Sequence, residues 1–142
     1  HMYRLTDDYM NVECLVHRLW QGEYREAPAV LKYHGKYYMI TSFCTGWEPN
    51  QAKYAVADGM EQPWGRLKEI GNETTFDSQA AFLLEVNGKL LYFGDRWGGN
   101  GEAYFSSGYV VYPLDEKDGV LTMEYREFFE GIEAVSESCS VG

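Results

Sequence analysis

An internal repeat in the sequence limits the folds that this chain can adopt. Residues 26–40 and 79–93 align without a gap at an offset of 53 residues, and each reads as an apolar strand, a turn and a second apolar strand. His34-Gly35 and Asn87-Gly88 occupy the two turns, where glycine tolerates the positive φ that a two-residue hairpin loop requires. The chain is therefore expected to contain the same β-hairpin twice.

The similarity continues beyond both hairpins. The sequence predicts third strands at 54–57 and 109–112 and fourth strands at 64–67 and 120–123. Asp58-Gly59 and Asp118-Gly119 mark turns before the fourth strands. Four antiparallel strands per repeat, at a period near fifty, are typical of a propeller blade. The predicted fold is all-β with two four-stranded antiparallel propeller blades, and a β-sandwich with unrelated hairpins is the alternative.

The N-terminal stretch has a different pattern. Its apolar residues have helical spacing and Asn11 is placed as an N-cap, which predicts a short helix over 12–20; these apolar residues are Val12, Leu15, Val16 and Leu19. Tyr3-Arg4-Leu5 is interpreted as the end of an earlier strand. The expected division is a cloning remnant (1–2), a preceding blade end plus helix (3–22), two blades (23–74 and 75–130) and a flexible tail (131–142).

Composition excludes several classes of partner. The formal net charge of -10 disfavours nucleic acid and anionic membranes, whereas a neutral sugar is compatible with it, and so is a surface that is acidic only for solubility. The cysteines Cys14, Cys44 and Cys139 have no metal-ligand spacing and are interpreted as free thiols. No metal and no cofactor are expected. No signal peptide or transmembrane run is present, so both a cytoplasmic and a secreted bacterial location stay open.

The repeat also indicates where chemistry is expected. Glu26 and Gln79 occupy the same place at the start of the innermost strand in each repeat. Adjacent blades direct such positions into one funnel, so the two side chains are expected to meet there. A protonated carboxyl group can protonate a glycosidic oxygen, and an amide can hold a hydroxyl or a water. Pro28 is expected to keep Ala27 extended and to give Glu26 a rigid position. A solvated carboxylate and a structural amide are the alternatives.

Both repeats contain further motifs around the two candidate residues. In the first repeat the motifs are Tyr24-Arg25-Glu26-Ala27-Pro28-Ala29-Val30, Gly35-Lys36-Tyr37-Tyr38, Thr41-Ser42, Thr45-Gly46-Trp47, Asn50, Tyr54-Ala55-Val56-Ala57 and Pro63-Trp64. In the second repeat they are Thr75-Phe76, Ser78-Gln79 and Gly94-Asp95-Arg96-Trp97. Together these motifs resemble glycoside hydrolase family 43, and most closely its exo-β-1,3-galactanase branch, over roughly residues 3–126.

The resemblance implies a five-bladed propeller and an inverting glycosidase without metal in the chemistry. It makes Glu26 the counterpart of the general acid and Gln79 the counterpart of the residue that orients the attacking water. A glutamine cannot take up a proton as a carboxylate does. The resemblance places Thr45 and Trp47 near the sugar, with Thr45 donating to a hydroxyl and Trp47 stacking on a pyranose face. Blade packing is the alternative for Trp47.

The second repeat supplies further candidates. Its second strand ends at Asp95, Arg96 and Trp97. An Asp95–Arg96 pair there is interpreted either as a brace for the Gln79 side of the mouth of the funnel or as a structural ion pair. Together with Thr45 and Trp47, these residues form the expected substrate-binding set.

The period of the repeat indicates how many propeller blades a chain of this length can form. At 53 residues per blade, the chain supplies fewer blades than the four to eight with which propellers usually close. The expectation is either a homo-oligomer or a missing N-terminal half. The resemblance also places two aspartates of the family, its general base and the residue that tunes the acid, upstream of Tyr3, so an incomplete site is expected in this chain. The functional alternatives are a non-catalytic carbohydrate-binding module and a structural assembly module derived from a glycosidase propeller.

Overall fold

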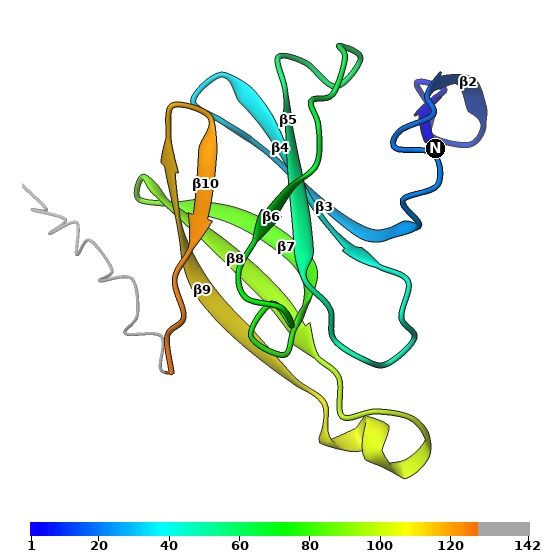
Figure 1. Ribbon diagram of the computed structural model, residues 1–142. Coiled ribbons are helices and arrows are strands. Elements are labelled where there is room, and N and C mark those ends of the chain that lie inside the picture. Colours follow the sequence, from blue (N-terminus) through cyan, green and yellow to red (C-terminus); the bar gives the residue numbers. More distant parts are fainter. Residues whose placement is uncertain (128–142) are drawn as a thin grey trace, which may run out of the picture.

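Two four-stranded antiparallel sheets make up most of the protein. A computed structural model describes residues 1–127. The first sheet has the order β3-β4-β5-β6 and the second the order β10-β9-β8-β7, so each follows the chain strand by strand (Figure 1). The first contains β3 (Arg25–Tyr33), β4 (Lys36–Phe43), β5 (Ala52–Ala57) and β6 (Lys68–Ile70). The second contains β7 (Gln79–Val86), β8 (Lys89–Arg96), β9 (Gly108–Lys117) and β10 (Val120–Met123). The two predicted blades are confirmed.

The tight hairpin turns follow the chemistry expected from the sequence. His34 and Gly35 have φ of 46° and 79°, and Asn87 and Gly88 have φ of 51° and 75°. Positive φ at both central residues is the geometry of a two-residue turn whose twist matches that of the flanking strands. The strands that follow these turns, β4 and β8, begin and end at residues that are 53 positions apart, which is the repeat offset. This agreement is expected because the turn sets the register of each hairpin.

The core lies between the two blades. Strand β3 packs against β7, and the ends of β6 and β10 also meet. Buried tyrosines are the largest side chains in this core, and they include Tyr38, Tyr54, Tyr92 and Tyr112. Polar contacts also cross the interface: the Tyr33 hydroxyl donates to the Gly88 carbonyl at 3.1 Å. A single buried cluster draws on both sheets, so each blade buries its apolar face against the other.

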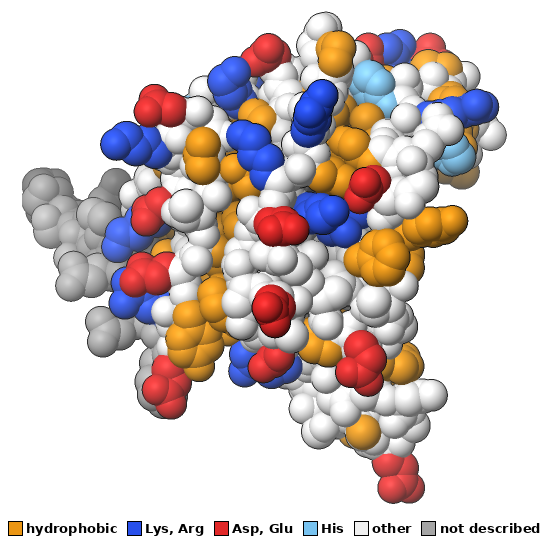
Figure 2. All heavy atoms as spheres, viewed as in Figure 1, with side chains coloured by type: hydrophobic (Ala, Val, Ile, Leu, Met, Phe, Trp, Pro, Cys, Tyr) orange, Lys and Arg blue, Asp and Glu red, His pale blue; other side chains and the backbone are white. Residues whose placement is uncertain are grey.

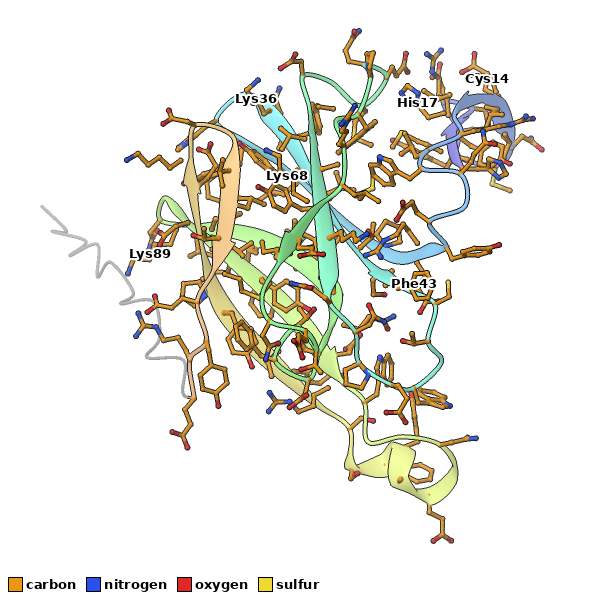
Figure 3. All side chains as sticks on the ribbon, in the orientation of Figure 1. Cys14, His17, Lys36, Phe43, Lys68 and Lys89 are labelled. Atoms are coloured by element: carbon orange, nitrogen blue, oxygen red, sulfur yellow. The ribbon has the colours of Figure 1, made fainter. Side chains whose placement is uncertain are left out.

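The N-terminal region is a hairpin, and the expected helix over 12–20 is wrong. Strand β1 (Met2–Leu5) contains the predicted strand and pairs with β2 (Val12–His17), as seen beside the two blades in Figure 1. Cys14 and His17 lie on this hairpin in Figure 3. Asn11 ends the turn instead of capping a helix, because its backbone N–H donates to the Thr6 hydroxyl at 3.1 Å. The backbone partners that β1 supplies outweigh the helical spacing of the apolar side chains.

The fourth strand of the first blade lies further along the chain than expected. Residues 64–67 are not a strand; β6 begins at Lys68. The Gly65 N–H donates to the Val56 carbonyl at 2.9 Å, and the Trp20 indole donates to the Gly65 carbonyl at 3.1 Å. These contacts hold 64–67 as a loop against the blade. The other expected third and fourth strands are confirmed as parts of β5, β9 and β10.

The only helix in the described residues is the 3-10 helix η1 (Gly101–Ser106), which lies in the loop between β8 and β9. This loop projects beyond the end of the blades in Figure 1. The Asn100 side chain accepts a hydrogen bond from the Gly101 N–H at the start of the helix. None of the residues of η1 is buried, so the helix does not contribute to the core.

Candidate active site

Glu26 and Gln79 meet where the two blades join. Glu26 lies near the start of β3, Gln79 begins β7, and both side chains are half-buried. The Gln79 side-chain amide, Nε2, donates a hydrogen bond to Glu26 Oε1 at 3.1 Å across a separation of 53 residues. The repeat offset therefore places a carboxylate and an amide in direct contact.

Gln79 has two further polar partners. Its Nε2 also donates to the hydroxyl of buried Ser42 at 2.9 Å, and its Oε1 accepts from the Trp97 indole nitrogen at 2.9 Å. An indole nitrogen can only donate, so this bond fixes which end of the amide faces Glu26. Both amide protons are engaged, and one acceptor position on Oε1 is left open. Gln79 is therefore held from both blades.

Each innermost strand has a bulge just after its site residue. One extra residue is inserted between Glu26 and Ala29 in β3, and another between Ala80 and Phe82 in β7. Ala27 has φ of 48°, so the expectation that Pro28 keeps it extended is wrong. Accommodation of the extra residue outweighs the usual restriction before proline. Such bulges re-aim neighbouring side chains, which is their role next to a site.

A left-handed turn precedes Gln79. Thr75, Phe76 and Asp77 have φ of 53°, 53° and 59°, a conformation that L-residues adopt at a cost of about 1–2 kcal/mol each. The fully buried Thr75 hydroxyl compensates by donating to the Asn50 carbonyl and accepting from the Ala52 N–H, both at 2.7 Å. The turn is thereby tied to the first blade, and this tie helps to set the position of Gln79.

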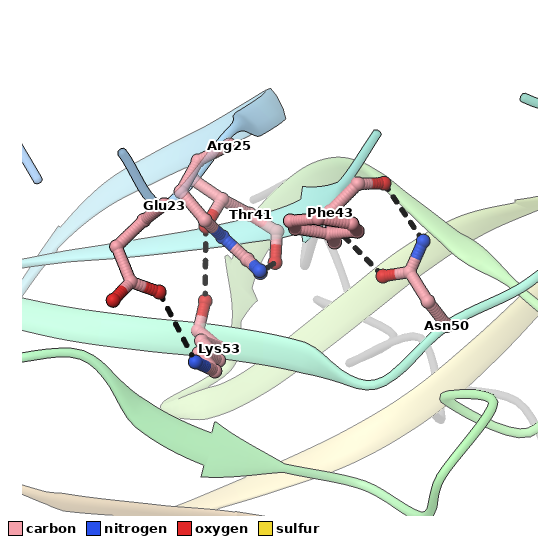
Figure 4. A network of polar contacts seen from close by, with 6 residues as sticks. All are labelled: Glu23, Arg25, Thr41, Phe43, Asn50 and Lys53. Atoms are coloured by element: carbon pink, nitrogen blue, oxygen red, sulfur yellow. Dashed lines mark hydrogen bonds and ion pairs between the residues drawn. The ribbon is translucent and has the colours of Figure 1, made fainter. Parts of the chain in front are cut away.

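The loop between β4 and β5 carries Thr45 and Trp47, and Asn50 shapes it. The Asn50 side chain bonds both the N–H and the carbonyl of Phe43 at 2.8 Å, like an extra strand partner (Figure 4). The same side chain donates to the Thr45 hydroxyl at 2.6 Å, and that hydroxyl donates to the Glu48 carbonyl at 2.6 Å. Thr45 therefore uses its only donor within the loop and supports the segment that holds Trp47.

Next to this loop, Arg25 and Thr41 support the strand that carries Glu26. The Arg25 guanidinium donates from Nε to the Thr41 hydroxyl at 3.0 Å and from Nη2 to its carbonyl at 2.6 Å (Figure 4). Burial lowers the pKa of Arg25 relative to its ordinary value. Lys53 forms an ion pair with Glu23 at 3.3 Å on the same side. These contacts fix the segment that immediately precedes Glu26.

An open depression of about 440 Å³ adjoins the Glu26–Gln79 pair. Trp47, Trp97 and Tyr104 line it together with both site residues. The Trp47 ring lies 5.6 Å from Trp97 and 5.9 Å from Tyr104, and Trp97 stacks on Tyr104 at 5.8 Å. Trp47 remains 43% exposed, so its ring is both packed and accessible. This arrangement offers aromatic faces beside a carboxylate and an amide.

Asp95 and Arg96 lie near Gln79 but do not pair with each other. Asp95 is the ladder partner of Gln79, as Ser42 is the ladder partner of Glu26. Arg96 donates instead to the Phe76 carbonyl at 2.9 Å and to the Tyr112 hydroxyl at 3.0 Å. No Asp95–Arg96 ion pair occurs in the described residues. Arg96 thus braces the turn before Gln79, and both residues line a smaller cavity of about 130 Å³.

Cys44 lies beside Glu26. Desolvation by its surroundings, followed by the neighbouring Glu26 carboxylate, raises the pKa of the Cys44 thiol above its ordinary value. A thiol with a raised pKa is protonated at neutral pH and is therefore a weak nucleophile. Cys14 and Cys44 are free cysteines, and Cys139 lies outside the described residues.

Metal-ligating clusters and long apolar helices are both absent from residues 1–127. No group of three or more His, Cys, Asp or Glu side chains there is arranged to hold a metal ion. No helix in that part of the chain is long and apolar enough to cross a membrane. Figure 2 shows acidic and basic side chains interspersed over the visible face, without a single extended patch of either sign.

Glu26, Gln79 and the tryptophans were predicted as candidate site residues from the sequence, whereas two residues that contact or adjoin them were not. Ser42 holds the Gln79 amide, and Tyr104 lines the depression. The repeat carried a signal for Ser42, because it stands 53 residues before Asp95. Tyr104 had no such signal, since the loop between β8 and β9 is longer than its counterpart between β4 and β5.

The two four-stranded antiparallel sheets are typical of propeller proteins, and comparison with known proteins makes this class more specific. No family model matches the chain. A solved exo-β-1,3-galactanase from Clostridium thermocellum is 45% identical, with a TM-score of 0.79 over 87% of this chain and 28% of that one. A solved family-43 β-1,3-galactosidase is 30% identical, with a TM-score of 0.76 over 89% and 38%. The resemblance to glycoside hydrolase family 43 and its exo-β-1,3-galactanase branch is confirmed.

A curated relative extends the comparison. A xylan 1,3-β-xylosidase from a Vibrio species is 27% identical over 112 residues, which are 75% of this chain and 20% of that protein. The chain thus spans about a fifth of this relative and well under half of the two solved structures.

Proposed function

We propose that the chain carries the acid-bearing part of a glycosidase site for β-linked, galactose-containing oligo- or polysaccharides. The observation that carries the proposal is the 3.1 Å hydrogen bond between Gln79 and Glu26 beside three aromatic rings. Sugar rings present apolar faces and hydroxyl edges, so aromatic faces and polar side chains are the groups that suit them. The names of the solved relatives, an exo-β-1,3-galactanase and a β-1,3-galactosidase, support galactose as the sugar.

In this proposal Glu26 is the general acid. It protonates the leaving glycosidic oxygen, and the reaction inverts the anomeric centre. Gln79 orients the attacking water through the open acceptor position on its Oε1. Because an amide cannot take up a proton, the proton that this water loses as it attacks passes to solvent. Inverting glycosidases keep their acid far enough from the opposite polar group to leave room for the attacking water. Because Gln79 Nε2 and Glu26 Oε1 are only 3.1 Å apart, binding of the sugar and the water must separate these two side chains.

The surrounding residues bind and position in this proposal. Trp47 presents its exposed ring to a pyranose face. Thr45 keeps its donor within the loop and so offers a sugar hydroxyl only an acceptor. Trp97 fixes the orientation of the Gln79 amide. Asp95 and Arg96 support the Gln79 side of the mouth from β8.

A non-catalytic carbohydrate-binding module is the second candidate. The direct contact between Glu26 and Gln79 favours it, because these two side chains leave no space between them for a reacting anomeric carbon. In such a module the aromatic depression and the polar pair bind a sugar without cleaving it.

Hydrolysis assays with β-1,3-galactan and aryl β-galactosides test the proposal. We expect turnover that Glu26→Gln abolishes, while Glu85→Gln, at an exposed position of β7, serves as the matched control. NMR of the first-formed product anomer checks inversion. Binding by calorimetry without turnover supports the module instead, and the absence of both turnover and binding contradicts both candidates.

A further inference from the structure

The loop between β8 and β9 displays aromatic side chains that the fold does not need. Tyr104 and Phe105 lie in η1 and are 45% and 87% exposed. Exposing a large apolar ring to water is unfavourable, and scattered single cases need no explanation. Here, however, the two rings are neighbours, with centroids 6.0 Å apart, and Tyr104 lines the depression beside the Glu26–Gln79 pair.

These rings continue the aromatic lining of the depression outward. Trp97 donates to Gln79, Tyr104 stacks on Trp97 at 5.8 Å, and Phe105 packs edge-to-face on Tyr104 at 78°. The strip formed by Trp97, Tyr104 and Phe105 therefore begins at the Gln79 amide and ends at a ring that is almost fully in solvent.

The loop that carries the strip is internally braced. The Ser107 hydroxyl accepts from the Gly98 N–H at 3.0 Å and donates to the Tyr104 carbonyl at 2.6 Å, and the Ser106 hydroxyl donates to the Ala103 carbonyl at 2.7 Å. At Gly98 a Cβ atom would lie 2.1 Å from the Ala103 carbonyl oxygen, so only glycine allows this closure. A braced loop presents its rings in a defined geometry, and ordering them on binding therefore costs little entropy.

We propose that the strip binds the next sugar units of an oligosaccharide whose terminal sugar occupies the depression. This inference rests on the proposed function and deepens it: the ligand class is a neutral β-linked oligosaccharide of two or more units. Such a ligand suits a chain with a formal net charge of -10, because it carries no charge to be repelled. Phe105, at the outer end of the strip, does not line the depression. It therefore adds affinity for longer oligosaccharides and contributes nothing to the binding of a single sugar.

Calorimetric titration with galactose and with β-1,3-galactotriose tests the proposal. Phe105→Ala is expected to weaken galactotriose binding by about three- to ten-fold, the range for one aromatic contact, and to leave galactose binding unchanged. The matched control is Tyr9→Ala, which removes another exposed ring from the distant turn between β1 and β2. Because η1 buries no residue, loss of the Phe105 ring leaves the core intact.

The remaining outcomes separate the two proposals. If both sugars bind Phe105→Ala as they bind the unmodified protein, the strip proposal is overturned while the proposed function stands. If the unmodified protein binds neither sugar, the proposed function fails and the strip proposal fails with it. If Phe105→Ala changes only the oligomeric mass in light scattering, Phe105 is a contact between copies and the strip proposal is again wrong.

Discussion

At the scale of single residues, Gln79 is the most constrained side chain of the site. Its two amide protons are donated to Glu26 and Ser42, and its oxygen accepts from Trp97. If the amide were flipped, its NH₂ group would face the indole N–H, and its oxygen would face the Glu26 carboxylate. Both contacts would be repulsive. Trp97 is therefore a positioning residue for Gln79 in addition to lining the depression.

Trp97→Phe tests this positioning role. The ring remains but the N–H donor is lost, so we expect a stability loss of about 1 kcal/mol and a changed NMR signal for the Gln79 side-chain amide. Trp47→Phe is the control, because no hydrogen bond of the Trp47 indole occurs within the described residues. An unchanged Gln79 amide signal in Trp97→Phe would show that the indole does not hold it.

The sequence was a good guide to residues that the repeat pairs and a poor guide to the others. Glu26 and Gln79 were predicted to meet, and their side chains do meet. Thr45 was expected to donate to a sugar, yet its donor is used by the Glu48 carbonyl. Such local bonds depend on the loop conformation, and no periodic pattern in the sequence reports that conformation.

At the scale of elements, the hairpin turns set the register on which the site depends. A one-residue slip in β7–β8 would turn the Gln79 side chain to the opposite face of the sheet. The turn that prevents such a slip has Asn87 and Gly88 at positive φ, and a Cβ at Gly88 would meet no atom within 4 Å. The cost of a substitution at Gly88 is therefore a backbone cost alone.

Gly88→Ala is expected to lower the free energy of unfolding by about 1 kcal/mol, because alanine disfavours left-handed φ. Chemical denaturation measures this change. Gly108→Ala is the matched control, since Gly108 also has open space around its Cβ position but is not at positive φ. Equal effects of the two substitutions would contradict the turn geometry.

The elements that the sequence mispredicted are those whose partners lie elsewhere in the chain. Val12–His17 has helical spacing but pairs with β1, and residues 64–67 are held as a loop by Val56 and Trp20. Local pattern cannot report such contacts. The two hairpins of the repeat were predictable because each hairpin specifies its own turn and its own alternation of apolar residues.

At the scale of the whole molecule, a polar contact between His34 of the first blade and Glu116 of the second joins the two blades. Glu116 of β9 accepts from the Gly119 N–H at 2.7 Å and bonds His34, in the β3–β4 turn, at 3.0 Å. The Gly119 hydrogen bond, followed by the one with His34, holds the pKa of Glu116 below its usual value of 4.5. This carboxylate therefore stabilises the fold above about pH 4.5, and the stabilisation is lost as the pH falls through its lowered pKa.

Glu116→Gln is expected to reduce stability at pH 7 by about 1 kcal/mol and to make the free energy of unfolding less dependent on pH in the acid range. Urea denaturation at a series of pH values measures both effects. Glu124→Gln is the control, because Glu124 is exposed and pairs only with Arg126 among the described residues. An unaltered acid slope in Glu116→Gln would contradict the account of this contact.

The expected homo-oligomer stays a prediction. Strands β6 and β10 are the outer edges of their sheets, and open edges invite pairing between chains. Light scattering at micromolar concentration gives the mass directly, and a monomer would count against the prediction.

We propose above that Glu26 and Gln79, from two adjacent blades, form one sugar site with the aromatic rings beside them. A heteronuclear NMR titration of the protein with galactose is the decisive experiment. If these residues form one site, the Gln79 side-chain amide and the Trp47 and Trp97 indole signals shift together and saturate with a single affinity. Shifts confined to other parts of the chain, or no shift at saturating sugar, would show that these residues do not bind the sugar.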